Sequence, residues 1–209
     1  MTDASPESIT VYSDYVCPFC YLGRESLRRY RESREADLNV DWHPFDLRRR
    51  KRGPDGEIDD SVDDGKGEEY YERARENVRR LQEKYDVEMA QEIATGVDSL
   101  PAQVASVHVA EAHPGKWAAF DRAVFDALWV DGRDIGDPDV LADLAGEVGL
   151  DGDEVRDAVD DDALRERVFE RFREATERGV TGVPTFVVDG HAARGAVPPE
   201  QLERLVEGG

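Results

Sequence analysis

The chain has 209 residues, of which 48 are acidic and 27 basic, so its formal net charge is −21. This length is enough to bury a hydrophobic core without staples, as one large domain or as a domain that carries an insertion. The negative charge opposes binding to nucleic acids and anionic membranes. The acidic residues are spread through amphipathic segments and only four lysines occur, which is typical of halophilic proteins whose folded surface stays hydrated in concentrated salt.

The amino terminus carries no recognisable targeting signal. Its first ten residues, MTDASPESIT, have neither a basic region nor an apolar run, so we expect no signal peptide. No stretch of the chain is long and apolar enough to span a membrane. We therefore expect a soluble cytoplasmic protein, and in a reducing compartment a lone pair of cysteines is more often catalytic than structural.

A Cys-x-x-Cys pair follows the first predicted strand. The run Ile9–Tyr12 is rich in β-branched and aromatic residues, and Cys17-Pro18-Phe19-Cys20 leads from it into a helical pattern. The first sulfur then lies at a helix N-terminus, where unpaired N–H groups and the helix dipole favour the reactive thiolate. The second sulfur lies one turn further on, close enough for a small disulfide. This placement predicts a thiol–disulfide oxidoreductase.

The cysteine pair has three other interpretations. A zinc site needs two more ligands, but His108 and His113 lie far along the chain and no second Cys-x-x-Cys occurs, so we expect no metal. A structural disulfide across so short a loop would stabilise the fold little. Two inert buried thiols remain a third interpretation. Pro18 at the first helical position favours the redox interpretation.

A second strand is predicted over Leu38–Phe45, where apolar and polar residues alternate and Pro44 indicates an edge or an end. His43 is expected to be an ordinary strand residue. The basic run Arg48–Arg52 is expected to be a solvated loop, with a patch for an acidic partner as the alternative. Residues 53–67, rich in Gly and Asp, are expected to form a loop that does not fit the calcium-binding pattern.

Helical periodicity then continues for more than 100 residues. The expected helices begin at Glu68, where Tyr70, Ala74, Val78 and Leu81 form an apolar face, and continue over 104–112, 117–130, 140–148, 153–159 and 164–175. Asp137 and Pro138 form an N-cap and a first helical position. Because no repeat period links these helices, we predict an all-helical insertion.

Strand signals return near the carboxyl end. Gly182–Gly190 reads as a strand ended by a hairpin turn, His191–Ala196 as its partner, and Pro198–Val206 as a closing helix. Pro184 at the head of the strand is either a plain edge proline or a cis proline. A cis bond would turn the Val183 backbone toward the cysteines, where an extended substrate could pair with it.

These segments resemble the DsbA-like thioredoxin-fold oxidoreductases, in particular their cytoplasmic FrnE-like group. The resembling stretches are Asp14–Gly23, Trp42–Leu47, Asp134–Ile135, Val140–Leu141, Gly149–Asp151 and Gly179–Val187. Two features depart from the family: Phe19 stands where tryptophan is usual, and an arginine run follows the second strand.

The resemblance implies an α/β protein with a thioredoxin fold interrupted by an all-helical insertion. The thioredoxin-like domain would be discontinuous, over 1–66 and 180–209, with the insertion over 67–179. It also implies a nucleophile at Cys17, a resolving cysteine at Cys20 and a cis-proline at Pro184. We expect the substrate to lie against Val183, Phe19, Pro18 and Tyr15.

The predicted activity is exchange of disulfides through a mixed disulfide on Cys17, with protein or small-molecule thiols and disulfides as partners. No cofactor beyond the redox-active cysteines is expected, with glutathione as a possible reductant. One rival is a glutathione-dependent isomerase or transferase of the hydroxychromene-carboxylate isomerase or kappa type, which resembles the same fold but typically has serine at the first cysteine position. A second rival is a redox-regulated holdase chaperone.

Overall fold

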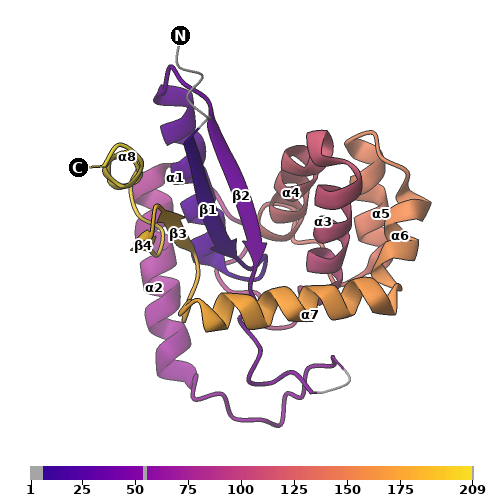
Figure 1. The fold of residues 1–209 in the computed structure, drawn as a ribbon. Helices are drawn as coiled ribbons and strands as arrows, with labels where there is room; N and C mark the ends of the chain where they lie inside the picture. The colour runs from indigo at the N-terminus through magenta and orange to yellow at the C-terminus, as the bar shows by residue number, and fades with distance from the viewer. Residues whose placement is uncertain (1–6, 54–55, 209) are drawn as a thin grey trace.

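A computed structural model describes residues 7–53 and 56–208 (Figure 1). The described residues exclude residues 1–6, where no signal peptide is expected, and Pro54 and Asp55 of the expected loop. The elements in chain order are β1 (Glu7–Ser13), α1 (Pro18–Ser33), β2 (Leu38–Pro44), α2 (Glu68–Tyr85), α3 (Leu100–Ala112), α4 (Pro114–Trp129), α5 (Pro138–Glu147), α6 (Gly152–Val159), α7 (Asp162–Glu177), β3 (Thr185–Val188), β4 (His191–Arg194) and α8 (Pro199–Val206). The predicted order of strands and helices is confirmed.

The four strands form one mixed sheet in the order β2-β1-β3-β4. β1 runs parallel to β2 and antiparallel to β3, and β3 pairs antiparallel with β4. Asp189 and Gly190 both have positive φ, which a tight hairpin turn between β3 and β4 requires. β2 is an edge strand that ends at Pro44, as the proline predicted.

Alternate residues of the strands face two different layers. Ile9 and Val11 of β1 pack with Leu27 of α1 and Leu202 of α8 on one face of the sheet. Tyr12 lies on the opposite face with Ala175 of α7. This is a thioredoxin fold, with α1 and α8 on one side and α7 on the other (Figure 1).

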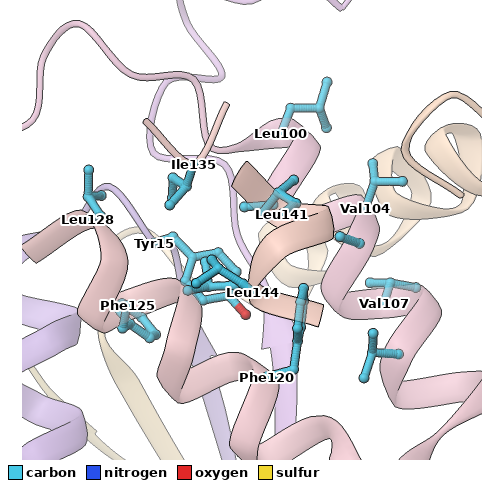
Figure 2. Packing of buried hydrophobic residues seen from close by; sticks show 14 of the residues in the cluster. Tyr15, Leu100, Val104, Val107, Phe120, Phe125, Leu128, Ile135, Leu141 and Leu144 are labelled. Atoms are coloured by element: carbon cyan, nitrogen blue, oxygen red, sulfur yellow. The ribbon is translucent and has the colours of Figure 1, made fainter. Parts of the chain in front are cut away.

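The segment between β2 and β3 holds the largest hydrophobic cluster of the described residues, built mainly by α3 to α7. Figure 2 shows part of this cluster, with Tyr15 surrounded by Phe120, Phe125 and Leu144. The expected helical insertion is therefore present, and its core is continuous with Tyr15, Cys17, Cys20 and Trp42 of the thioredoxin part. None of the helices in the described ranges combines the length and apolar character that crossing a membrane requires.

Helix α2 packs apart from the other helices that follow β2. Its buried Val78 and Tyr85 cluster with Leu22 of α1, and the Tyr85 hydroxyl donates a hydrogen bond to the Ala196 carbonyl 2.7 Å away. Figure 1 shows α2 alongside α1 and away from α3 to α6. The predicted domain boundaries at 67 and 179 stay a prediction, but the packing of α2 joins it to the thioredoxin part.

The basic run after β2 differs from expectation. The Arg52 side chain is only 4% exposed and binds the carboxylates of Asp46 and Asp98 at 2.7 and 2.8 Å. Burial by itself raises the pKa of Asp98, and the hydrogen bonds and charge of Arg52 more than offset it, so that pKa is lowered. The expectation of a solvated loop is therefore wrong for Arg52, which ties this segment to the residues just before α3, whereas Arg49 and Arg50 are exposed as expected.

Candidate active site

Cys17 is the N-cap residue of α1. Its backbone is extended, with φ −94° and ψ 112°, and its carbonyl accepts the N–H groups of Cys20 at 3.0 Å and Tyr21 at 3.3 Å. Pro18 occupies the first turn, where its missing N–H costs no hydrogen bond. The local sequence therefore places the first sulfur at the amino end of α1, as predicted.

Both cysteines are free thiols and both are 2% exposed. Burial raises the pKa of the Cys20 thiol well above its usual range, and the neighbouring Cys17 raises it further. Cys20 thus stays protonated in the resting dithiol, which suits a thiol that reacts second.

The segment before β3 meets the cysteines from the other side. The Val183–Pro184 peptide bond is cis, and the Cys17 thiol donates a hydrogen bond to the Val183 carbonyl oxygen 3.5 Å away. A Cβ atom at Gly23 would lie 3.0 Å from Pro184 Cγ, so glycine lets α1 approach this proline closely. Among the described residues, the Val183 N–H makes no hydrogen bond.

A pocket of about 280 Å³ opens beside Cys17. Three of the residues expected to contact substrate, Pro18, Phe19 and Val183, line it. The helix α2 and the loop before it supply much of the remaining wall, through Arg48, Lys51, Asp60, Asp64, Lys66, Tyr70, Tyr71 and Ala74. Because these side chains lie around a nearly buried sulfur, the pocket favours a narrow or small partner.

The pocket is locally basic in an acidic protein. It contains three cationic side chains and two carboxylates: Lys51 pairs with Asp60 at 3.4 Å, and Lys66 with Asp64 at 3.2 Å. The third cation, Arg48, donates to the carbonyl of Ala94 and forms no ion pair within the described residues. One positive charge is therefore left in excess beside Cys17.

Tyr70, predicted to lie on the apolar face of a helix, lines this pocket. It is 46% exposed. Partial burial, followed by the charge of the nearby Cys17, raises the pKa of its phenol. Helical periodicity could not reveal this role, because it depends on where the first turn of α2 docks.

Tyr15, expected to contact substrate, lies elsewhere. It is fully buried and lines neither pocket next to the cysteines. Its hydroxyl lies 2.7 Å from Ser106 Oγ and donates to Asp121 at 3.0 Å, and its carbonyl accepts the Trp129 indole N–H at 2.8 Å. Tyr15 therefore joins the Cys-x-x-Cys loop to the helical insertion (Figure 2).

Asp14 is a buried acid directly behind the cysteines. Its carboxylate accepts the Leu47 N–H at 2.8 Å and the Gln103 side-chain amide at 3.3 Å. Burial, and then the charge of Asp46, raises the pKa of Asp14 to about 6. The negative charge of Asp14 also contributes to the raised pKa of Cys20, so ionisation of either group disfavours ionisation of the other.

A second pocket, of about 210 Å³, lies on the Cys20 side. Pro184 and Phe186 form part of its wall together with Trp42, Trp117 and Phe125. The two cysteines therefore border different cavities, and the one at Cys20 combines aromatic side chains with four arginines, Arg24, Arg28, Arg31 and Arg122.

A thioredoxin fold with a dithiol at the start of α1, facing a cis proline, defines a thiol–disulfide oxidoreductase. The family model of the DSBA-like thioredoxin domain matches residues 8–207, and the chain belongs to this family. Among curated proteins, the uncharacterized protein YwbO of Bacillus subtilis (strain 168) is 30% identical over 202 residues, which cover 95% of this chain and 94% of YwbO.

Several solved structures have a similar fold. The probable DsbA oxidoreductase SCO1869 from Streptomyces coelicolor is 25% identical, with a TM-score of 0.74 over 96% of this chain and 90% of that one. A 2-hydroxychromene-2-carboxylate isomerase is 21% identical, with a TM-score of 0.74 over 96% and 93%. The cytosolic disulfide reductase DsbM from Pseudomonas aeruginosa, solved with GSH, is 22% identical, with a TM-score of 0.62 over 96% and 93%. The last two likenesses concern the fold alone.

Proposed function

We propose that the protein exchanges disulfides through a mixed disulfide on Cys17. The Cys17 thiolate attacks one sulfur of the substrate disulfide, and the other substrate sulfur leaves as a thiolate. Cys20 then loses its proton and attacks the Cys17 sulfur, which releases the second substrate thiolate and leaves a Cys17–Cys20 disulfide. The substrate gains the two electrons that the cysteine pair loses, and the reverse sequence oxidises a dithiol.

The observation that carries this proposal is the contact between the Cys17 thiol and the Val183 carbonyl, 3.5 Å apart. This contact holds the Cys17 sulfur beside a backbone segment whose N–H is free of partners among the described residues, which supports an attack from this position. An extended substrate can pair with that segment while its disulfide lies against Cys17. Main-chain pairing of this kind accepts substrates of many sequences.

We further propose that the preferred substrate is a small anionic disulfide of the glutathione type. The pocket volume of about 280 Å³ favours a small partner, and the excess positive charge of Arg48 favours carboxylate groups. The similar fold of DsbM, described as a cytosolic disulfide reductase and solved with GSH, supports this choice. In a reducing cytoplasm, where we place this protein, the corresponding direction is reduction of substrate.

The test is a thiol-trapping redox titration of the wild type, Cys17→Ser and Cys20→Ser against defined thiol–disulfide buffers. We expect a reversible two-electron transition in the wild type only, with a midpoint between about −270 mV, as in thioredoxin, and about −120 mV, as in DsbA. Cys20→Ser should trap a mixed disulfide with the substrate, whereas Cys17→Ser should trap none. The exchange mechanism is wrong if no Cys17–Cys20 disulfide forms at any potential.

The similar fold of the hydroxychromene-carboxylate isomerase supports a second candidate function, that of a glutathione-dependent isomerase. Such an enzyme would bind reduced glutathione without oxidising it. Glutathione binding that survives Cys20→Ser, together with the absence of a disulfide in the titration, would favour the isomerase.

A further inference from the structure

Three potential metal ligands converge at a place remote from the cysteines in sequence. His108 lies on α3, His113 follows at the junction of α3 and α4, and Glu154 lies in the first turn of α6. Helices α3 and α6 pack against one another in the insertion, on the right of Figure 1. We propose that these three side chains, called here the His–His–Glu cluster, bind a divalent transition metal of the zinc class.

The distances within the cluster fit such a site. The Nε2 atoms of His108 and His113 lie 2.8 and 3.0 Å from the same atom, Glu154 Oε1. The three ligand atoms all lie within 4.8 Å of one another. Ligands bound at the usual zinc–nitrogen and zinc–oxygen lengths of about 2.1 Å in a tetrahedron are about 3.4 Å apart. To admit the ion, the two nitrogen–oxygen distances would lengthen by about half an ångström, and the two imidazole nitrogens, within 4.8 Å of one another, would move to that same spacing.

The ligand chemistry also fits. Two imidazoles and one carboxylate form a donor set that zinc uses in proteins, and imidazole nitrogens select for zinc, copper and nickel over calcium and magnesium. No fourth His, Cys, Asp or Glu joins the cluster within the described ranges, so water would complete the coordination. The net charge of −21 raises the local concentration of cations around the whole protein.

The cluster is partly shielded, which distinguishes it from a chance surface pair. The side chains of His108, His113 and Glu154 are 22%, 34% and 41% exposed. A bound ion would join the junction of α3 and α4 to the start of α6, and would thereby stabilise the packing of these helices. No sequence pattern links Glu154 to the two histidines, because Glu154 comes near them only after α6 has folded onto α3.

The test must separate this cluster from the thiols, which also bind zinc. We would titrate Co²⁺, read by its visible absorption, and then displace it with Zn²⁺, in a Cys17→Ser/Cys20→Ser background. The expected result is one equivalent bound per chain. Glu154→Gln and His108→Gln should each weaken binding at least tenfold, while His191→Gln, an exposed histidine on β4, should leave it unchanged.

A second readout uses stability. Zn²⁺ should raise the Tm of the cysteine-free protein, and Glu154→Gln should remove that shift, since a ligand that binds only the folded state stabilises it. Glu154 is exposed enough for this variant to fold. The proposal is overturned if the cysteine-free protein binds no Co²⁺ or Zn²⁺ saturably, or if Glu154→Gln and His191→Gln bind the metal equally well.

Discussion

The thiol of Cys17 donates its hydrogen to the carbonyl oxygen of Val183, although 166 positions separate the two residues. The hydrogen bond holds the sulfur against the segment proposed to receive the substrate. It also exists only in the thiol form, because a thiolate has no hydrogen to donate. Deprotonation therefore releases the sulfur from the backbone at the moment it becomes a nucleophile.

The charge of the pocket predicts a selective effect on anionic substrates. Arg48→Gln and Lys51→Gln should each raise KM for oxidised glutathione roughly three- to tenfold, because each removes a cation near the substrate carboxylates. KM for a neutral disulfide such as hydroxyethyl disulfide should stay unchanged. Steady-state kinetics at low salt measures both.

Two matched variants test this interpretation. Arg80→Gln changes the charge equally on the exposed surface of α2, outside the pocket lining, and should alter neither KM. Asp60→Asn removes an acid from the pocket and should lower KM for oxidised glutathione. Equal effects of Arg48→Gln and Arg80→Gln would show that only the net charge of the protein matters.

Tyr70→Phe should slow exchange without loosening the fold. Tyr70 lines the pocket at Cys17, and the charge of Cys17 helps to raise the pKa of its phenol, so the polar hydroxyl favours a thiolate that forms or leaves in this pocket. We expect kcat/KM to fall roughly two- to tenfold when the hydroxyl is removed. The urea midpoint should not move, and Tyr71→Phe, also in the pocket wall, should retain full activity.

Tyr15→Phe should lower stability and leave KM unchanged, the reverse of Tyr70→Phe. This change leaves the buried Ser106 and Asp121 without the phenol hydroxyl, so we expect unfolding to become easier by about 1–3 kcal/mol. KM should be unaffected, since Tyr15 borders neither pocket at the cysteines. A raised KM with unchanged urea stability would restore the substrate-binding role that the sequence indicated.

Asp14 predicts a dependence of stability on pH. Its pKa is about 6 in the folded protein, against an ordinary 3.8, so the fold favours the protonated acid. The ionised acid therefore destabilises the folded state progressively as pH rises from about 4 to about 6, by ~3 kcal/mol in total. About 2 kcal/mol of this falls between about pH 4.5 and about pH 7.5.

The measurement compares wild type and Asp14→Asn in urea unfolding at those two pH values. Asp14→Asn removes the same hydrogen bonds at both pH values. Only the change with pH in the stability difference between variant and wild type therefore reports ionisation of Asp14. We expect the variant to gain about 2 kcal/mol relative to wild type on going to the higher pH. A difference between wild type and Asp14→Asn that stays the same at both pH values would contradict the raised pKa.

The parts of the site that could be predicted from the sequence depend on local patterns. Cys17 follows a strand and precedes Pro18, and these neighbours alone place its sulfur at the start of a helix. The strand beginning after Pro184 and its hairpin turn were equally visible, since turn residues and β-branched runs act over a few positions. The resemblance to a known family then linked the Cys17 segment to the Pro184 segment as two parts of one site.

The roles of Tyr15 and Tyr70 depend instead on packing between distant segments. Tyr15 is near the cysteines in sequence, yet Ser106 and Asp121 draw its hydroxyl into the insertion. Tyr70 is far from them, yet docking of α2 against α1 brings it to the pocket. Arg52 is a third case, because its partner Asp98 lies 46 positions away.

The separation of Cys17 from Val183 has a consequence for the newly made chain. The dithiol leaves the ribosome first, and the segment that must cover it follows 166 residues later. At ordinary translation rates of about 5–20 residues per second, this interval is on the order of ten to thirty seconds. During that time the cysteines of the nascent polypeptide are open to any oxidant, and selectivity arises only once the Val183 segment has been made and has folded onto them.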